Sequence, residues 1–230
     1  MKFSLNPTSI HNIRYELLLI ALMFMMFNSL IFPPEVVRFA VAPFAAAFTY
    51  LSGALLFAKD PPRIRYPYYI FLLFIYAGTI YFVIEALHTD FRQRNDIAIL
   101  QGLYFLYWVI LLWKLILKIF RSQRVSLNMI FASVSGFVAL IFMGATLFGV
   151  IEHFNPNSFP GMDMSNPNIF DEYIYFSFIT QSSIGFGEIT PGNPVAKKGV
   201  ILMGTLGQFY LIILVGLIVS KYASSNKEAA

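Results

Sequence analysis

The chain has 230 residues, of which 58% are hydrophobic and only 12% are charged, with 16 Lys and Arg against 12 Asp and Glu. A soluble domain carries about 25% charged residues, so this composition excludes a water-soluble globule and predicts an integral membrane protein in a lipid bilayer. The lack of cysteine excludes disulfides and zinc–thiolate sites, and a net charge of +4 gives no reason to expect a nucleic-acid partner.

Apolar stretches of the length that a transmembrane helix needs, about 20 residues, occur six times along the chain. These stretches are Tyr15–Phe32, Val36–Phe57, Tyr68–Leu87, Ile97–Leu117, Leu127–Ile151 and Ala196–Ser220. The first and second are each followed by a pair of prolines, Pro33-Pro34 and Pro61-Pro62, which cannot continue a helix and therefore indicate tight turns. The sequence predicts an all-α protein with six transmembrane helices.

The positively charged residues divide unequally between the two sides of these spans. One side holds Lys2, Arg14, Lys59, Arg63, Arg65, Lys114, Lys118, Arg121, Arg124, Lys221 and Lys227, and the other holds Arg38, Arg92, Arg94, Lys197 and Lys198. Because Lys and Arg concentrate on the cytoplasmic side, we predict a multi-pass protein of the cell membrane with both termini in the cytoplasm. A cleaved signal peptide is the alternative, but the first apolar run is too long for one and lacks a small-residue cleavage site.

Basic residues with helical spacing stand at the end of the fourth span, at Lys114, Lys118, Arg121 and Arg124. This spacing invites a voltage-sensor interpretation. However, Ile97–Trp113 carries no charge, and all four basic residues fall at the cytoplasmic end of the span. We therefore interpret them as anchors that reach the lipid headgroups.

The segment Asn168–Pro191, between the fifth and sixth spans, is too apolar for an exposed loop and too short to cross the membrane twice. Asn168 is a candidate helix cap, with Asp171 and Glu172 in the first turn, where the helix dipole favours acidic side chains. A helix that ends near Ser182 is roughly 21 Å long and reaches only the middle of the bilayer. This pattern predicts a re-entrant helix.

Glycine alternates with larger residues directly after this helix, in Ser183-Ile-Gly-Phe-Gly187. Gly185 and Gly187 adopt φ > 0 freely, so the alternation lets successive carbonyls point the same way. Non-helical backbone at membrane depth is tolerated only where it is buried in protein or lines a polar cavity. Four such strands around an axis would replace the water shell of a cation.

The stretch of residues 175–191, YFSFITQSSIGFGEITP, resembles the pore helix and selectivity filter of the tetrameric potassium channels, a family of pore-loop cation channels. Gly207-Gln-Phe-Tyr-Leu211 is similar to a run in the inner helix of many bacterial members, and the whole resemblance covers Asn168–Lys221. It implies a bacterial-type six-helix channel without a cytoplasmic ligand-binding domain. Such a channel conducts K⁺ passively, each chain has three identical subunits as partners, and no cofactor is needed.

The resemblance also assigns roles to individual residues. The selectivity filter that binds K⁺ would comprise Ser183, Ile184, Gly185, Phe186 and Gly187, with the ions at the first four of these. The residues that support the filter would be Tyr175, Thr180 and Glu188. The inner cavity and gate would be lined by Gln208, Leu211, Val215 and Val219, and the hinge would be Gly207, with Gly204 as the alternative. Ser183 replaces the usual Thr of the family, so we expect a looser innermost ion site. Glu188 replaces the usual Asp, and we predict that the Tyr175 phenol bonds to it.

The sequence suggests a peripheral four-helix domain at 1–124, a pore domain at 125–222 and a short cytoplasmic tail at 223–230. A poorly selective monovalent cation channel and a non-conducting scaffold or sensor subunit remain alternatives. Gly185-Phe-Gly-Glu188 superficially resembles a motif of intramembrane aspartyl proteases, but no Asp lies within the six apolar cores, so we do not expect an enzyme. The acidic residues expected to concentrate cations at the outer mouth are Glu152, Asp163, Asp171, Glu172 and Glu188.

Overall fold

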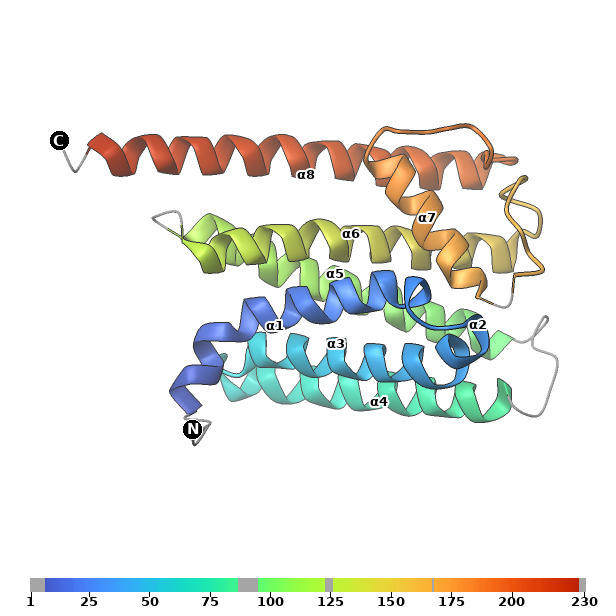
Figure 1. Ribbon diagram of the computed structural model, residues 1–230, viewed down its shortest axis with the longest axis horizontal. Coiled ribbons are helices and arrows are strands. Elements are labelled where there is room, and N and C mark those ends of the chain that lie inside the picture. The colour runs from blue at the N-terminus through green and yellow to red at the C-terminus, as the bar shows by residue number, and fades with distance from the viewer. Residues whose placement is uncertain (1–6, 87–94, 123–125, 167, 228–230) are drawn as a thin grey trace.

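The protein is a bundle of long helices in the computed structural model, which describes residues 7–86, 95–122, 126–166 and 168–227 (Figure 1). The helices are α1 (Pro7–Phe27), α3 (Ala42–Phe57), α4 (Pro62–Ala86), α5 (Asn95–Arg121), α6 (Leu127–Phe154), the shorter α7 (Ile169–Gln181) and α8 (Pro194–Lys227). Three short helical pieces, η1 (Asn28–Leu30), α2 (Pro34–Val36) and η2 (Val37–Val41), connect α1 to α3. The described ranges contain no β-strand.

Within the described residues, five helical segments are long and apolar enough to cross a membrane. They are Ile13–Leu30, Pro34–Phe57, Ile99–Arg121, Leu127–Phe154 and Pro194–Ile218, and they coincide with five of the six predicted spans. The remaining span, the third in chain order (Tyr68–Leu87), falls on α4, and its last residue lies outside the described residues. The chain is therefore an α-helical membrane protein, while a membrane crossing by α4 stays a prediction.

The two proline pairs start helices, as their chemistry requires. Pro33 is extended at φ −60° and ψ 151°, and Pro34 is the first residue of α2. Pro62 likewise opens α4. Proline has no N–H to donate, and the first residue of a helix needs no N–H partner, so this position accepts proline without loss. The predicted turns at both proline pairs are present.

The helix α6 forms the centre of the bundle, because most of its side chains are buried, whereas those of α8 are largely exposed. The rings of Trp108 on α5 and Phe142 on α6 stack with their centroids 4.9 Å apart. In Figure 1, α8 lies along one side of the bundle and α7 slopes between α6 and α8. The beginning of α1 and the end of α8 are at one end, and α7 with its flanking loops is at the opposite end.

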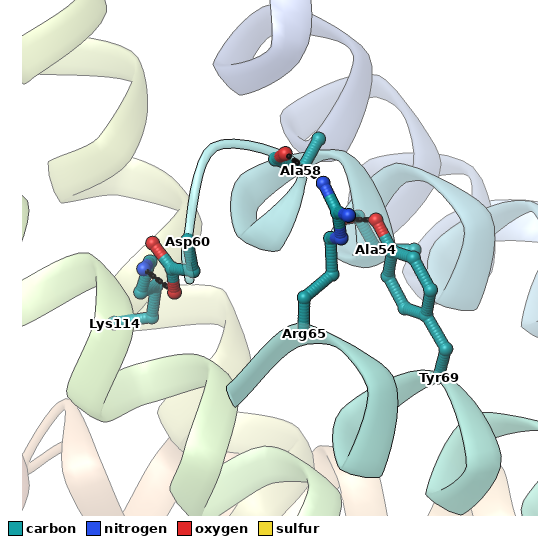
Figure 2. Close-up of polar contacts among 6 residues, drawn as sticks. All are labelled: Ala54, Ala58, Asp60, Arg65, Tyr69 and Lys114. Carbon is teal, nitrogen blue, oxygen red and sulfur yellow. Dashed lines mark hydrogen bonds and ion pairs between the residues drawn. The ribbon is translucent and has the colours of Figure 1, made fainter. Parts of the chain in front are cut away.

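The turn between α3 and α4 is held by contacts from the first turns of α4 (Figure 2). The Arg65 guanidinium donates to the Ala58 carbonyl oxygen over 3.1 Å, and the Tyr69 hydroxyl donates to that of Ala54 over 3.5 Å. Both acceptors belong to the last turns of α3 or to the residue directly after it. These bonds satisfy carbonyls that the end of a helix leaves without a partner.

Lys114 of α5 reaches the same turn. Its ammonium forms an ion pair with the Asp60 carboxylate and lies 4.7 Å from the centroid of the Phe57 ring (Figure 2). The Lys114 ammonium is thus paired with the turn between α3 and α4, and its role as a headgroup anchor stays a prediction. This partner could not be predicted from a local pattern, since Asp60 lies 54 positions earlier in the chain.

Candidate functional site

The short helix α7 is fixed to the central helix α6 by buried polar side chains. The Ser177 hydroxyl donates to the Ile141 carbonyl over 2.7 Å, and the Gln181 amide donates to the Leu140 carbonyl over 3.0 Å and to the Ser177 hydroxyl over 2.8 Å. A Cβ at Gly144 would lie 2.2 Å from the Ser177 hydroxyl, so only glycine permits this approach. These contacts set the tilt of α7 against the bundle.

The helix α7 begins and ends almost where the sequence predicts. It starts at Ile169, directly after Asn168, and ends at Gln181 with Ser182 as its last flanking residue. The predicted cap by Asn168 is wrong, because its side chain makes no capping hydrogen bond. The Asn168 amide instead donates to the Pro34 carbonyl over 3.4 Å and so ties the start of α7 to α2.

The end of α7 is a Schellman motif. The Ile184 N–H donates to the Ile179 carbonyl over 2.9 Å, and the Ser183 N–H donates to the Thr180 carbonyl over 3.2 Å. This motif needs a left-handed residue, usually glycine, at the position that Ser183 occupies with φ 56°. A β-branched residue is a stronger outlier at positive φ than serine is. Serine is therefore easier to accommodate at this position than threonine would be.

Every second residue of the predicted filter segment is left-handed. The φ angles are 56° at Ser183, 52° at Gly185 and 94° at Gly187, which confirms the predicted conformation of Gly185. A Cβ at Gly185 or Gly187 would meet nothing within 4 Å, so the backbone angle, and not lack of space, accounts for glycine here. The residues from Ser183 to Glu188 are exposed on the surface of the chain.

The outer end of this segment is braced by a side chain of α7. The Tyr175 hydroxyl donates to the Glu188 carboxylate over 2.5 Å, and both residues are exposed. The predicted contact between these two side chains is thus present. Its effect on conduction stays a prediction.

The loop after α6 is clamped by a buried acidic residue. The Glu152 carboxylate accepts hydrogen bonds from the N–H groups of Asn157 (2.7 Å) and Ser158 (2.9 Å). Ser158 in turn contacts the segment that follows the filter, since its hydroxyl accepts from the Asn193 amide (2.6 Å) and its carbonyl from the Gly192 N–H (2.8 Å). Glu152 is buried, so its predicted place among mouth-lining charges is wrong and its role is to hold the loop.

A glycine of this loop touches the backbone beside the filter, and sequence reasoning missed it. Gly161 has φ 93°, and a Cβ there would lie 1.8 Å from the Glu188 carbonyl oxygen. Next to it, the Thr190 N–H donates to the Pro160 carbonyl over 3.1 Å. The only signal in the sequence is a Pro-Gly pair, which indicates a turn without naming what the turn contacts.

The remaining acidic residues near this end differ in their surroundings. Asp163 is exposed, and hydrogen bonds from the Ser165 hydroxyl and N–H hold the pKa of its carboxyl below the usual value. Glu172 is half-buried and accepts from the Asn166 amide over 3.0 Å. Among the other predicted acidic residues, Asp163 and Glu188 are exposed and Asp171 is half-buried like Glu172, and the attraction of cations to them stays a prediction.

The helix α8 contacts the junction between α7 and the predicted filter segment. The Gln208 amide donates to the Gln181 carbonyl over 3.0 Å and to the Ser183 hydroxyl over 2.7 Å. A Cβ at Gly207 would lie 2.8 Å from the Cβ of Gln181, so close packing against α7 accounts for glycine at this position. Gly204 has only ordinary contacts with Thr180. A hinge at Gly207 stays a prediction.

The predicted pore-lining residues share one face of α8. Gln208, Leu211 and Val215 follow each other at steps of three and four, and Val215 is exposed. The side chains of α8 that face α5 and α6, among them Tyr210 and Leu217, lie on the opposite face. The side chain of Val219, the fourth predicted member, lies outside the described residues.

Fold and site together define a helical membrane protein in which a short helix and an exposed, glycine-containing segment are inserted between the last two long helices. Residues 136–224 match a family model described as an ion channel. This stretch runs from α6 into α8 and includes the whole site, and the match indicates ion channel activity. Searches among curated proteins and among solved structures found no match.

Proposed function

We propose that this protein is a K⁺-selective channel that conducts K⁺ passively across the cell membrane. The observation that carries the proposal is the left-handed backbone at Ser183, Gly185 and Gly187, in a segment exposed at the end of α7. Such alternation lets successive carbonyls face one side, as a ladder of cation sites requires. In this proposal K⁺ binds at Ser183, Ile184, Gly185 and Phe186, and it is the permeant ion, with no cofactor involved.

The proposal includes a homotetramer, because one filter strand cannot surround an ion. The exposed filter segment offers no ring of ligands within a single chain. The helix α8 also exposes large apolar side chains, among them Ile201 (60% exposed) and Ile212 (66% exposed), which are available to other copies or to lipid. Three further copies of the chain would complete the ring of carbonyls and would bury the exposed apolar side chains of α8.

The domain and membrane assignments are part of the same proposal. Residues 1–124 form the peripheral domain with four of the six spans, residues 125–222 the pore domain, and residues 223–230 a cytoplasmic tail. Gln208, Leu211, Val215 and Val219 line the inner cavity and its gate. Both termini face the cytoplasm, in keeping with the distribution of Lys and Arg.

One observation favours a poorly selective cation channel as the second candidate. The Ser183 hydroxyl, the proposed ligand of the innermost site, accepts a hydrogen bond from the Gln208 amide. A hydroxyl oxygen has two lone pairs, so this bond uses half of its capacity to bind a cation. Such a site would hold K⁺ less tightly than one with a free hydroxyl.

Reversal potentials decide between these candidates. The purified protein is reconstituted in planar bilayers with KCl on one side and NaCl on the other. A reversal potential near that of K⁺ supports the proposal, and one near zero favours the poorly selective channel. Absence of current from protein that runs as a folded tetramer would overturn both and leave a scaffold or sensor subunit.

A further inference from the structure

The last residue of α7, Gln181, lies where three helices meet. Its side chain is fully buried, and its amide donates to the Leu140 carbonyl of α6 over 3.0 Å. Its own backbone carbonyl accepts a hydrogen bond from the Gln208 amide of α8, also over 3.0 Å. The proposed filter begins two positions later, at Ser183. Gln181 therefore contacts both long helices of the site directly before the filter segment.

Glycines on both long helices let them approach Gln181 closely. A Cβ at Gly144 of α6 would lie 2.8 Å from the Gln181 amide nitrogen. A Cβ at Gly207 of α8 would lie 2.8 Å from the Gln181 Cβ and 3.0 Å from its carbonyl oxygen. A larger residue at either glycine would push Gln181 away, so close packing fixes this residue from two sides.

The contact with α6 needs the two donors of a primary amide. The Gln181 amide nitrogen donates to the Leu140 carbonyl and, over 2.8 Å, to the Ser177 hydroxyl, so both of its N–H groups are used. The Ser177 hydroxyl in turn donates to the Ile141 carbonyl over 2.7 Å. The two side chains thus join α7 to two consecutive carbonyls of α6. A methionine at position 181 would have similar length but no donor.

The Gln181 amide contributes little to stability. Its oxygen, Oε1, is buried and has no hydrogen-bond partner among the described residues. A buried acceptor without a partner costs free energy, which offsets part of what the two donated bonds contribute. Loss of the amide would strand no other group, because Leu140 lies within α6 and keeps its helical main-chain bond, and Ser177 keeps its bond to Ile141. The amide therefore fixes a position more than it stabilises the fold.

The backbone of the filter segment follows the last turn of α7. The N–H groups of Ile184 and Gly185 both donate to the Ile179 carbonyl, over 2.9 Å and 3.3 Å. Phe186 carries no hydroxyl with which the filter could be held from its own side chain. A displacement of the last turn of α7 therefore moves the filter carbonyls, and the arrangement of these oxygens is what a carbonyl filter uses to select ions.

We propose that Gln181 is a positioning residue for K⁺ selectivity. Its amide bonds to α6 and its carbonyl bond to α8 hold the end of α7, and thereby the filter carbonyls, in the arrangement that K⁺ requires. Gln181 does not contact the ion itself. This inference rests on the proposed function and extends it to a residue that neither the motif nor the family match assigns.

The first test is Gln181→Met in the reconstituted full-length protein. We expect the K⁺/Na⁺ permeability ratio, from reversal potentials, to fall at least about fivefold. The thermal unfolding midpoint in detergent should stay close to that of the wild type, which separates positioning from a general loss of stability. Thr146→Val is the matched control, because it removes a buried hydroxyl that bonds only to carbonyls of α6, those of Phe142 and Met143. This control should keep the wild-type ratio.

The second test is hydrogen–deuterium exchange of the peptide 180–188, which needs no ion current. Gln181→Met should speed exchange in this peptide severalfold and leave α3 and α5 unchanged. Ser177→Ala, which removes only the Ser177 bonds, replaces Gln181→Met if that variant does not assemble, with smaller changes of the same sign.

The two tests separate failure of this inference from failure of the proposed function. A wild-type reversal potential near zero would refute K⁺ selectivity, and the exchange result would then decide whether Gln181 positions the segment. In a K⁺-selective wild type, an unchanged permeability ratio in Gln181→Met would overturn the inference. So would unchanged exchange in the peptide 180–188, or faster exchange throughout the chain.

Discussion

The phenol of Tyr175, on the short helix α7, donates a hydrogen bond of 2.5 Å to the carboxylate of Glu188, the first residue after the filter segment. A hydrogen bond to a charged acceptor is stronger than one between neutral groups. Phe186 carries no hydroxyl, so the filter side chain cannot supply a second bond of this kind. The Tyr175–Glu188 contact is thus the polar side-chain brace that the structure gives this end of the segment.

We predict that Tyr175→Phe destabilises the outer filter. K⁺ current should decay severalfold faster during sustained opening, most of all in low external K⁺, when fewer ions hold the filter apart. Current recorded from reconstituted channels under a voltage step measures the decay. Tyr76→Phe, which removes an exposed phenol from α4, is the control. Identical decay in Tyr175→Phe and wild type would mean that the bond does not brace the filter.

Gly161→Ala should displace the backbone beside the filter. The new Cβ would lie 1.8 Å from the Glu188 carbonyl oxygen, and φ is 93° at this position. We expect a loss of at least about 2 kcal/mol per chain from the strained backbone and the overlap. Thermal unfolding in detergent measures the loss. Gly102→Ala, where a Cβ meets nothing within 4 Å, should not lower the midpoint and should raise it slightly, because alanine favours a helix more than glycine does.

Gly185→Ala should abolish K⁺-selective current while the tetramer stays assembled. The left-handed backbone at Gly185 has space for a Cβ, so the cost arises from the φ angle of 52° and is of order 1–2 kcal/mol per chain. Reversal potentials and native mass spectrometry give the two readouts. Gly216→Ala, an unhindered glycine of α8, is the matched control. Unchanged selectivity in Gly185→Ala would refute the carbonyl ladder.

Gln208→Leu should separate the inner helix from the base of the filter. It removes both hydrogen bonds of the Gln208 amide, while Ser183→Ala removes only the one to the Ser183 hydroxyl. We therefore expect a larger loss of thermal stability in Gln208→Leu, about 1 kcal/mol for each bond removed. In Ser183→Ala the permeability ratio of K⁺ to Na⁺ should fall, because the hydroxyl ligand is lost. Equal stability of the wild type, Gln208→Leu and Ser183→Ala would mean that the hydrogen bonds of Gln208 do not hold α8 against the filter segment.

Asp60 and Lys114 should show a measurable coupling energy in a double-mutant cycle with Asp60→Asn and Lys114→Met. Their side chains are 20% and 26% exposed, so water screens the pair only in part, and we expect about 1 kcal/mol. Unfolding in detergent at low salt measures each variant. A cycle of Asp60→Asn with Lys118→Met, whose ammonium lies 5.7 Å from the Tyr15 ring, should show much weaker coupling. Equal coupling energies in the two cycles would contradict a specific ion pair between Asp60 and Lys114.

The helices and the filter segment could be predicted because their signals are local in the sequence. Apolar length predicts a span, and the glycines at 185 and 187 indicate a special backbone within a few residues. The end of α7 was predicted to within one residue for the same reason.

The tertiary contacts of Glu152, Gly161 and Lys114 could not be predicted, because their partners are distant in sequence or belong to the backbone. The Glu152 carboxylate binds two N–H groups of a loop, and every sequence offers such groups. Gly161 meets the carbonyl of Glu188, 27 positions later. Helical spacing does not reveal the ion pair of Lys114 either, because Asp60 lies in the turn between two other helices. Tertiary contacts of this kind leave no periodic pattern.

The connection between α5 and α6 is short. The helix α5 ends at Arg121 and α6 begins at Leu127. A chain of this length extends at most about 20 Å, and α5 stacks on α6 through Trp108 and Phe142. Whatever number of copies assemble, we therefore expect a defect in α5 to act on α6 of its own chain. Mixed assemblies should combine such defects copy by copy, without rescue in trans.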